Sequence, residues 1–202
     1  ISFFNIMTFN RWWDMRVKLG VVQGRATNFA MLINTFIPPP APESELTPEE
    51  FKKAAEEYRI RYVSVRYFNL AHALLYKSAD GDTSAAPLVR EGFATAEEGQ
   101  ILDNEGRTLP FQVAYGWIMS ILQTALDRKM ITEGQWRMLL DDVMQARAAS
   151  VEAMAYLNTQ IPYYYVHLIA TVVKLHLILV STAFGSIIGN GLQREIWFDV
   201  AF

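Results

Sequence analysis

The sequence predicts an all-α protein that combines a membrane-spanning helix with long helices outside the membrane. Hydrophobic residues make up 51% of the 202 residues and charged residues 19%, below the roughly 25% charge of an average soluble domain. Residues 165–189 form an apolar run with one formal charge, long enough for a helix to cross a bilayer. The segments before it place apolar residues at helical spacing.

The chain opens on a short apolar stretch, residues 1–9, followed by NRWWDMR at residues 10–16. Nine residues are too few to cross a bilayer, which takes about 20 in a helix, but they suit the end of a spanning helix. Trp12 and Trp13 followed by cations are typical of a membrane interface. A soluble helix with a buried tryptophan pair fits the composition equally well, so both interpretations stay open.

Helical spacing continues over residues 21–37, and a proline-rich break follows at residues 37–50. Thr47 at the N-cap and Pro48 at the first helical position predict a long helix over residues 48–79. Thr95, followed by two glutamates, predicts another helix start.

Two more helices are expected over residues 110–128 and 132–157. The first is apolar and about long enough to span a membrane. Its glutamines and its flanks fit a buried helix of a soluble domain equally well, so the pattern leaves this choice open.

The clearest membrane candidate is residues 165–189, which tyrosines precede as an aromatic belt. Lys174 lies deep in this run, where a cation costs roughly 2.5–3.5 kcal/mol on insertion scales. We therefore expect it to face protein, water or a partner rather than lipid. The alternative is a buried soluble helix whose lysine reaches a carboxylate.

Several functional classes find no support in the sequence. There is no cysteine, which excludes disulfides, thiol nucleophiles and cysteine-based zinc sites. The net charge of -3 gives no reason to expect nucleic-acid binding. His167 and His176 point to opposite sides of one helix and cannot share a metal, and no catalytic constellation or phosphate-binding loop is present. We expect neither an enzyme nor a bound cofactor.

Five segments, in order and with similar gaps, resemble the bestrophins, a family of pentameric anion channels. They are NRWWDMR (10–16), RYVSVRYFNLAHALLY (61–76), LVREGFATAEEGQIL (88–102), LPFQVAYGWI (109–118) and IPYYYVHLIATVV (161–173).

The resemblance implies a homopentamer in a lipid bilayer that passes chloride or bicarbonate through an axial pore. Phe3 would be the last of three neck positions, where the positive edges of aromatic rings favour anions. A second constriction, the aperture, would fall at Thr159. Further candidates for the ion pathway or the membrane interface are Arg11, Trp12, Trp13, His167 and Lys174. We expect the tryptophans to pack rather than to contact ions.

The same resemblance implies a division of the chain into five regions. Residues 1–20 would end a pore-lining membrane helix, and 21–47 would hold a helix and a proline-rich linker. A cytosolic helical region would cover 48–160, a membrane helix 161–189, and a loop with the start of the next membrane helix 190–202.

Some parts of the family pattern lie outside the sequence given. A first membrane helix would precede residue 1, and the acidic calcium clasp of the family would follow residue 202, so no calcium site carries over to these residues. The alternative function is a non-conducting helical scaffold subunit of a larger membrane complex.

Overall fold

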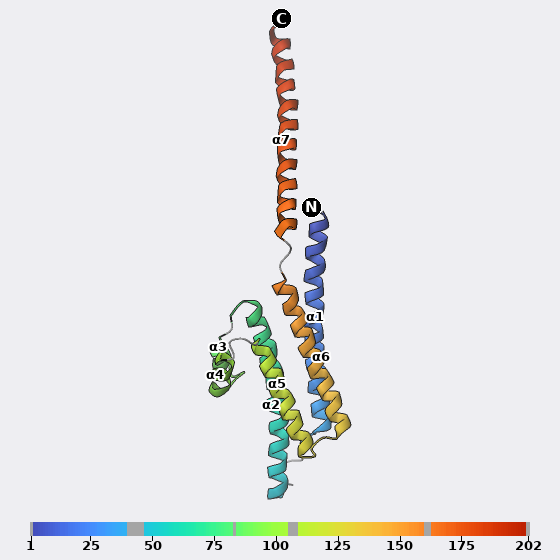
Figure 1. Ribbon diagram of the computed structural model, residues 1–202, viewed down its shortest axis with the longest axis vertical. Coiled ribbons are helices and arrows are strands. Elements are labelled where there is room, and N and C mark those ends of the chain that lie inside the picture. Colours follow the sequence, from blue (N-terminus) through green and yellow to red (C-terminus); the bar gives the residue numbers. More distant parts are fainter. Residues whose placement is uncertain (1, 40–46, 83, 105–108, 160–162, 201–202) are drawn as a thin grey trace. The chain divides into compact units, whose positions relative to one another are not determined.

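The computed structural model describes residues 2–39, 47–82, 84–104, 109–159 and 163–200, and every regular element in these ranges is a helix. The elements are α1 (Ser2–Phe36), α2 (Pro48–Ala79), α3 (Ala86–Arg90), α4 (Ala96–Asn104), α5 (Pro110–Asp127), α6 (Glu133–Asn158) and α7 (Tyr163–Val200) (Figure 1). The all-α prediction is therefore confirmed. The chain divides into two compact units, Arg11–Asn158 and Ile1–Asn10 with Thr159–Phe202, which are described separately.

The unit Arg11–Asn158 is built around α5. This helix packs along α2 and also contacts α6 (Figure 1). Phe111, Tyr115, Ile118 and Leu122 are fully buried along it, at the i, i+3, i+4 spacing of a core-facing stripe. Of the two interpretations left open for residues 110–128, the structure therefore supports the buried core helix.

Helix α2 begins where the sequence predicts. The Thr47 side chain accepts a hydrogen bond from the Glu50 amide, and the Glu50 carboxylate accepts one from the Thr47 amide at 2.9 Å. This reciprocal capping satisfies two backbone donors that the first turn leaves without helical partners. Pro48 occupies the first turn, where its missing N–H costs nothing.

Helix α1 runs without interruption across residues 20 and 21, where the sequence suggested a boundary between two regions. Its second half contributes Phe29 and Ile33 to the core of the unit. The ring of Phe29 lies 4.7 Å from that of Phe68 on α2, measured between centroids. Gly20 and Gly24 do not end the helix, because glycine lowers helix propensity by about 1 kcal/mol without removing a backbone hydrogen bond.

Helix α7 contains the membrane candidate. Among the described residues, one segment is long and apolar enough to cross a membrane, Val166–Ser186, and none of its residues is buried within the chain. The loop expected from residue 190 is not observed, since the helix continues to Val200. Gly189 and Gly191 weaken a helix but keep its hydrogen bonds, and no proline follows them.

Candidate functional site

The tryptophan pair lies on the surface of its unit. Trp12 and Trp13 are 47% and 51% exposed, with ring centroids 6.1 Å apart. The guanidinium of Arg16 lies 5.8 Å from the Trp12 ring centroid, a cation–π distance. The indoles are therefore not core residues of this unit. Half-exposed aromatics beside cations are the arrangement expected at a membrane interface or a subunit contact.

Arg11 lies beside the indoles but binds the end of another helix. Its Nη2 donates hydrogen bonds to the carbonyl oxygens of Tyr156 and Leu157, in the last turn of α6. Carbonyls in a last turn lack helical donors and carry the negative end of the helix dipole. The Arg11 guanidinium thus caps α6, a role that the sequence did not reveal.

Arg11 is the first of three cations spaced seven residues apart on one face of α1, a spacing that keeps side chains aligned on a helix. Lys18 pairs with Glu152 on α6. Arg25 pairs with Asp142 on α6 at 2.9 Å between Nη1 and Oδ1, and Asp142 is 4% exposed. The seven-residue spacing is the signal in the sequence that could have identified this connection between α1 and α6.

The remaining predicted site residues belong to the other unit. Thr159 is exposed in the bend that follows α6, and His167 and Lys174 are exposed on α7. Phe3 lies within α1, but its side chain is outside the described part of the structure. The predicted site residues are therefore divided between two units, with Arg11, Trp12 and Trp13 in one and the others in the second.

The candidate membrane helix has a polar side. At about 100° per residue, five polar residues fall within an arc of roughly 100°: His167, Thr171, Lys174, Ser181 and Thr182. His176 lies on the opposite side of the helix. The hydroxyls of Thr171 and Thr182 donate to backbone carbonyls of their own helix, which lowers their cost in an apolar environment. Lys174 has no such internal acceptor for its charge, and residues 163–186 include no acidic residue.

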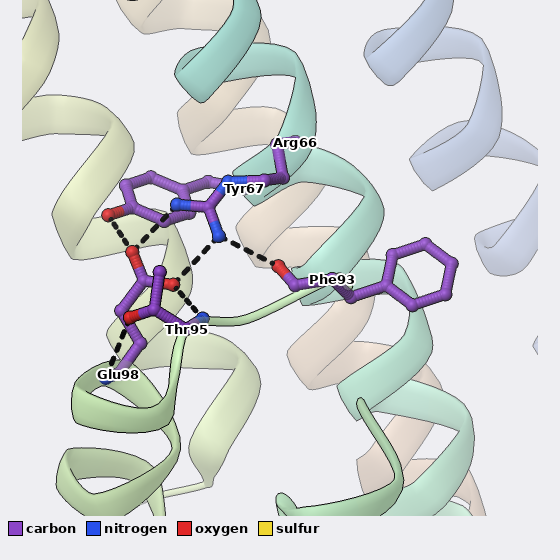
Figure 2. A network of polar contacts seen from close by, with 5 residues as sticks. All are labelled: Arg66, Tyr67, Phe93, Thr95 and Glu98. Atoms are coloured by element: carbon purple, nitrogen blue, oxygen red, sulfur yellow. Dashed lines mark hydrogen bonds and ion pairs between the residues drawn. The ribbon is translucent and has the colours of Figure 1, made fainter. Parts of the chain in front are cut away.

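A polar network joins two of the segments that carry the family resemblance (Figure 2). Arg66 on α2 donates two hydrogen bonds to the Glu98 carboxylate on α4, at 2.7 and 2.8 Å. Tyr67 donates a third to Glu98 at 2.6 Å, and the Thr95 amide donates a fourth at 2.8 Å. Arg66 also donates to the carbonyl of Phe93 at 3.1 Å. The loop before α4 is thereby attached to α2.

The network shifts the pKa values of its members. Burial alone would raise the pKa of Glu98, but hydrogen bonds from Arg66, Tyr67 and Thr95 lower it to about 2. Burial and the hydrogen bond to Glu98 raise the pKa of Tyr67 to about 12. The hydrogen bond to Glu98 also raises the pKa of Arg66 above its ordinary value. At neutral pH the network is therefore a fixed ion pair rather than a proton donor or acceptor.

The sequence indicated only part of this network. Thr95 and Glu98 have the three-residue spacing of a capping box, and the structure shows both of its hydrogen bonds. The bonds from Arg66 and Tyr67 to Glu98 join residues about 30 positions apart. Such pairs depend on how α3 and α4 fold back on α2, which no local spacing encodes.

Within the described residues, no group of three or more histidine or acidic side chains is arranged to hold a metal ion. The titratable groups with the largest pKa shifts, Tyr67 and Glu98, are hydrogen-bonded to each other at 2.6 Å.

Comparison with known proteins gives one match. A family model described as "Bestrophin, RFP-TM, chloride channel" matches residues 1–193. No curated protein and no solved structure matches the chain.

Proposed function

The chain belongs to the bestrophin family of chloride channels, and on that premise we propose that it is a subunit of an anion channel. The pore forms on the axis of a homo-oligomer in a membrane and conducts chloride or bicarbonate by electrodiffusion. The observation that carries the proposal is the family match over residues 1–193 of 202.

The proposed pore narrows at a ring of Phe3 side chains, one from each subunit. The edges of aromatic rings carry partial positive charge, so such a ring favours anions over cations. A hydrophobic constriction also excludes water when it closes, which makes the same ring suitable as a gate. The position of Phe3 on α1, nine residues before the cation–aromatic segment at Trp12, supports placing it inside the membrane.

The polar side of α7 supports a protein or water environment for this helix. An ammonium group at the depth of Lys174 costs roughly 2.5–3.5 kcal/mol when it faces lipid. We therefore propose that Lys174 and His167 face the ion pathway or a neighbouring helix. In either position the charge of Lys174 attracts anions toward the pore.

Thr159 is proposed as the residue of the second constriction. Its position in an exposed bend after α6 suits a short collar of side chains around a pore. The hydroxyl of Thr159 attracts water more strongly than an aliphatic side chain would at this constriction. Such a constriction excludes water, and therefore ions, less completely.

Chloride efflux from liposomes tests the proposal. The full-length protein is reconstituted into liposomes loaded with chloride. Efflux begins when an ionophore that carries a counter-ion balances the charge that leaves with chloride. We expect Phe3→Ala to increase the efflux rate, because the ring no longer seals, whereas the matched variant Phe9→Ala on the same helix leaves it near that of the wild type. No efflux from wild-type protein, or equal effects of the two variants, would contradict the proposal and favour a non-conducting scaffold subunit.

A further inference from the structure

A pocket of about 620 Å³ lies beside the Arg66–Glu98 network, within the unit Arg11–Asn158. One wall is α2, and the others are the end of α1 and the connection between α3 and α4. Arg66 and Phe93, which are joined in Figure 2, both line it. Its volume is within the range of small-molecule sites, roughly 300–1,000 Å³.

Arg61 is the unusual member of the pocket lining. It is 8% exposed, and its Nε is buried without a hydrogen-bond partner in the described part of the chain. None of the ion pairs found among the described residues includes it. The Cζ atom of Arg61 lies 5.9 Å from the centroid of the Tyr58 ring, a cation–π distance. A buried guanidinium without a counter-charge is costly, and the usual compensation is an anion.

Most acidic side chains around Arg61 already have partners. Glu57, four residues earlier on α2, pairs with Lys53, and Glu98 is held by Arg66. Glu91 also lines the pocket, as an exposed residue. Among the described residues, Arg66 is neutralised by Glu98, whereas the buried Arg61 is paired with no carboxylate. A single unpaired cation suits a monoanion better than a phosphate dianion.

The remaining lining indicates what the anion is attached to. Val65 and Phe93 supply apolar walls, and the stacked rings of Tyr58 and Tyr62, 6.0 Å apart at 12°, form the rim. Asn34 and Asn69 add two amides that donate or accept hydrogen bonds. A guanidinium binds a carboxylate through two parallel hydrogen bonds, and aromatic and aliphatic side chains provide contact area for an apolar body.

We propose that this pocket binds a small organic monocarboxylate, with its carboxylate on the Arg61 guanidinium and its apolar or aromatic body between Val65, Phe93 and the two tyrosines. None of the lining residues is among the residues proposed for the ion pathway, and the proposal does not depend on the chain conducting anions. Its ligand differs from chloride because the pocket is much larger than a halide and mostly apolar.

Calorimetric titration of the full-length protein in detergent with sodium benzoate, at constant ionic strength, tests the proposal. Sodium chloride and sodium phosphate are titrated in parallel. We expect saturable benzoate binding, weakened about tenfold or more by Arg61→Gln, as loss of a charge-assisted hydrogen bond predicts. Arg59→Gln, which removes the same charge from an exposed position on α2, serves as the matched control and retains wild-type affinity.

A second variant keeps the test valid if Arg61→Gln does not fold. Val65→Trp fills the pocket and leaves Arg61 in place, and circular dichroism verifies that both variants remain helical. Loss of benzoate binding in Val65→Trp supports the site even if Arg61→Gln does not fold. Absence of saturable benzoate binding in the wild type, unchanged binding in Val65→Trp, or equally tight binding of chloride or phosphate that depends on Arg61, would overturn the proposal.

Discussion

Glu98 shows how one side chain secures a segment of the fold. Its carboxylate accepts four hydrogen bonds, two from Arg66 and one each from Tyr67 and the Thr95 amide. Both members of the ion pair have side chains that are 14% exposed, so solvent screens the pair less than a surface salt bridge. Removing the negative charge would leave Arg66 largely buried and without its counter-charge.

Replacement of this carboxylate should destabilise the protein. We expect Glu98→Gln to lower the free energy of unfolding by about 2 kcal/mol, because a charge-assisted pair is lost and a buried cation remains. In a protein of this size that corresponds to a fall of roughly 6 °C in Tm. Glu97→Gln, at the exposed neighbouring position, is the control and should leave Tm nearly unchanged. Equal Tm values for the two variants would contradict the role assigned to the network.

The same carboxylate predicts an acid dependence of stability. Its pKa is about 2 in the folded protein and close to 4.5 without these contacts. A lowered folded-state pKa means that the stabilisation is complete above about pH 4.5 and is lost as the pH falls toward 2. The difference in Tm between wild type and Glu98→Gln should therefore shrink over that range. A difference that stays constant from pH 6 to pH 3 would show that the charge of Glu98 is not the cause.

At the level of elements, two ion pairs that differ in burial connect α1 and α6. The Arg25–Asp142 pair has a buried carboxylate, whereas the side chains of Lys18 and Glu152 are 34% and 51% exposed. Exposed pairs contribute at most about 1 kcal/mol. A buried carboxylate that loses its partner costs more, since its desolvation is then uncompensated.

This inequality predicts different effects of two similar substitutions on α1. Arg25→Met should destabilise the protein by about 3 kcal/mol, and Lys18→Met by less than about 1 kcal/mol. Thermal unfolding of both variants in one detergent measures the difference. Similar losses of stability in the two variants would mean that burial of Asp142 does not determine the strength of the contact.

Helix α7 also supports a prediction of its own. Lys174 lies on the polar side of the helix, and its charge is expected to repel cations from the pathway or from the pore entrance. Lys174→Met should therefore lower the ratio of chloride to potassium permeability. Leu179→Met, on the apolar side, is the control. An unchanged ratio in Lys174→Met would place this lysine away from the pathway.

The elements themselves were largely predictable from the sequence, because their start signals are local. Thr47, Pro48 and Glu50 predicted the start of α2, and the observed helix Pro48–Ala79 has the expected bounds. Periodicity could not decide whether residues 110–128 cross a membrane or form the core, since both environments favour the same apolar residues. Nor did it reveal that α7 extends past residue 190, because isolated glycines are weak helix terminators.

The candidate site was less predictable, for a related physical reason. Arg11 caps α6 from 145 positions away in the sequence. Arg61 has no ion-pair partner among the described residues, although a local pattern would have placed one at Glu57. Contacts of this kind depend on the packing of whole helices. The residues chosen from the family resemblance, above all Phe3 and Thr159, remain predictions.

At the scale of the whole molecule, the described surface includes many exposed apolar side chains on α7. Leu177, Leu179 and Phe184 on α7 are each more than half exposed, as are other apolar residues of this helix. Exposed apolar area of this kind marks contact with lipid or with other protein chains. Together with the family membership, this supports residence in a membrane.

The most direct test of the central claim is the reversal potential of the reconstituted protein in a planar bilayer under a tenfold gradient of potassium chloride. A bestrophin-type channel subunit predicts a current that reverses close to the chloride equilibrium potential. A current that reverses near the potassium potential, or no current at all above that of protein-free membranes, would contradict the claim.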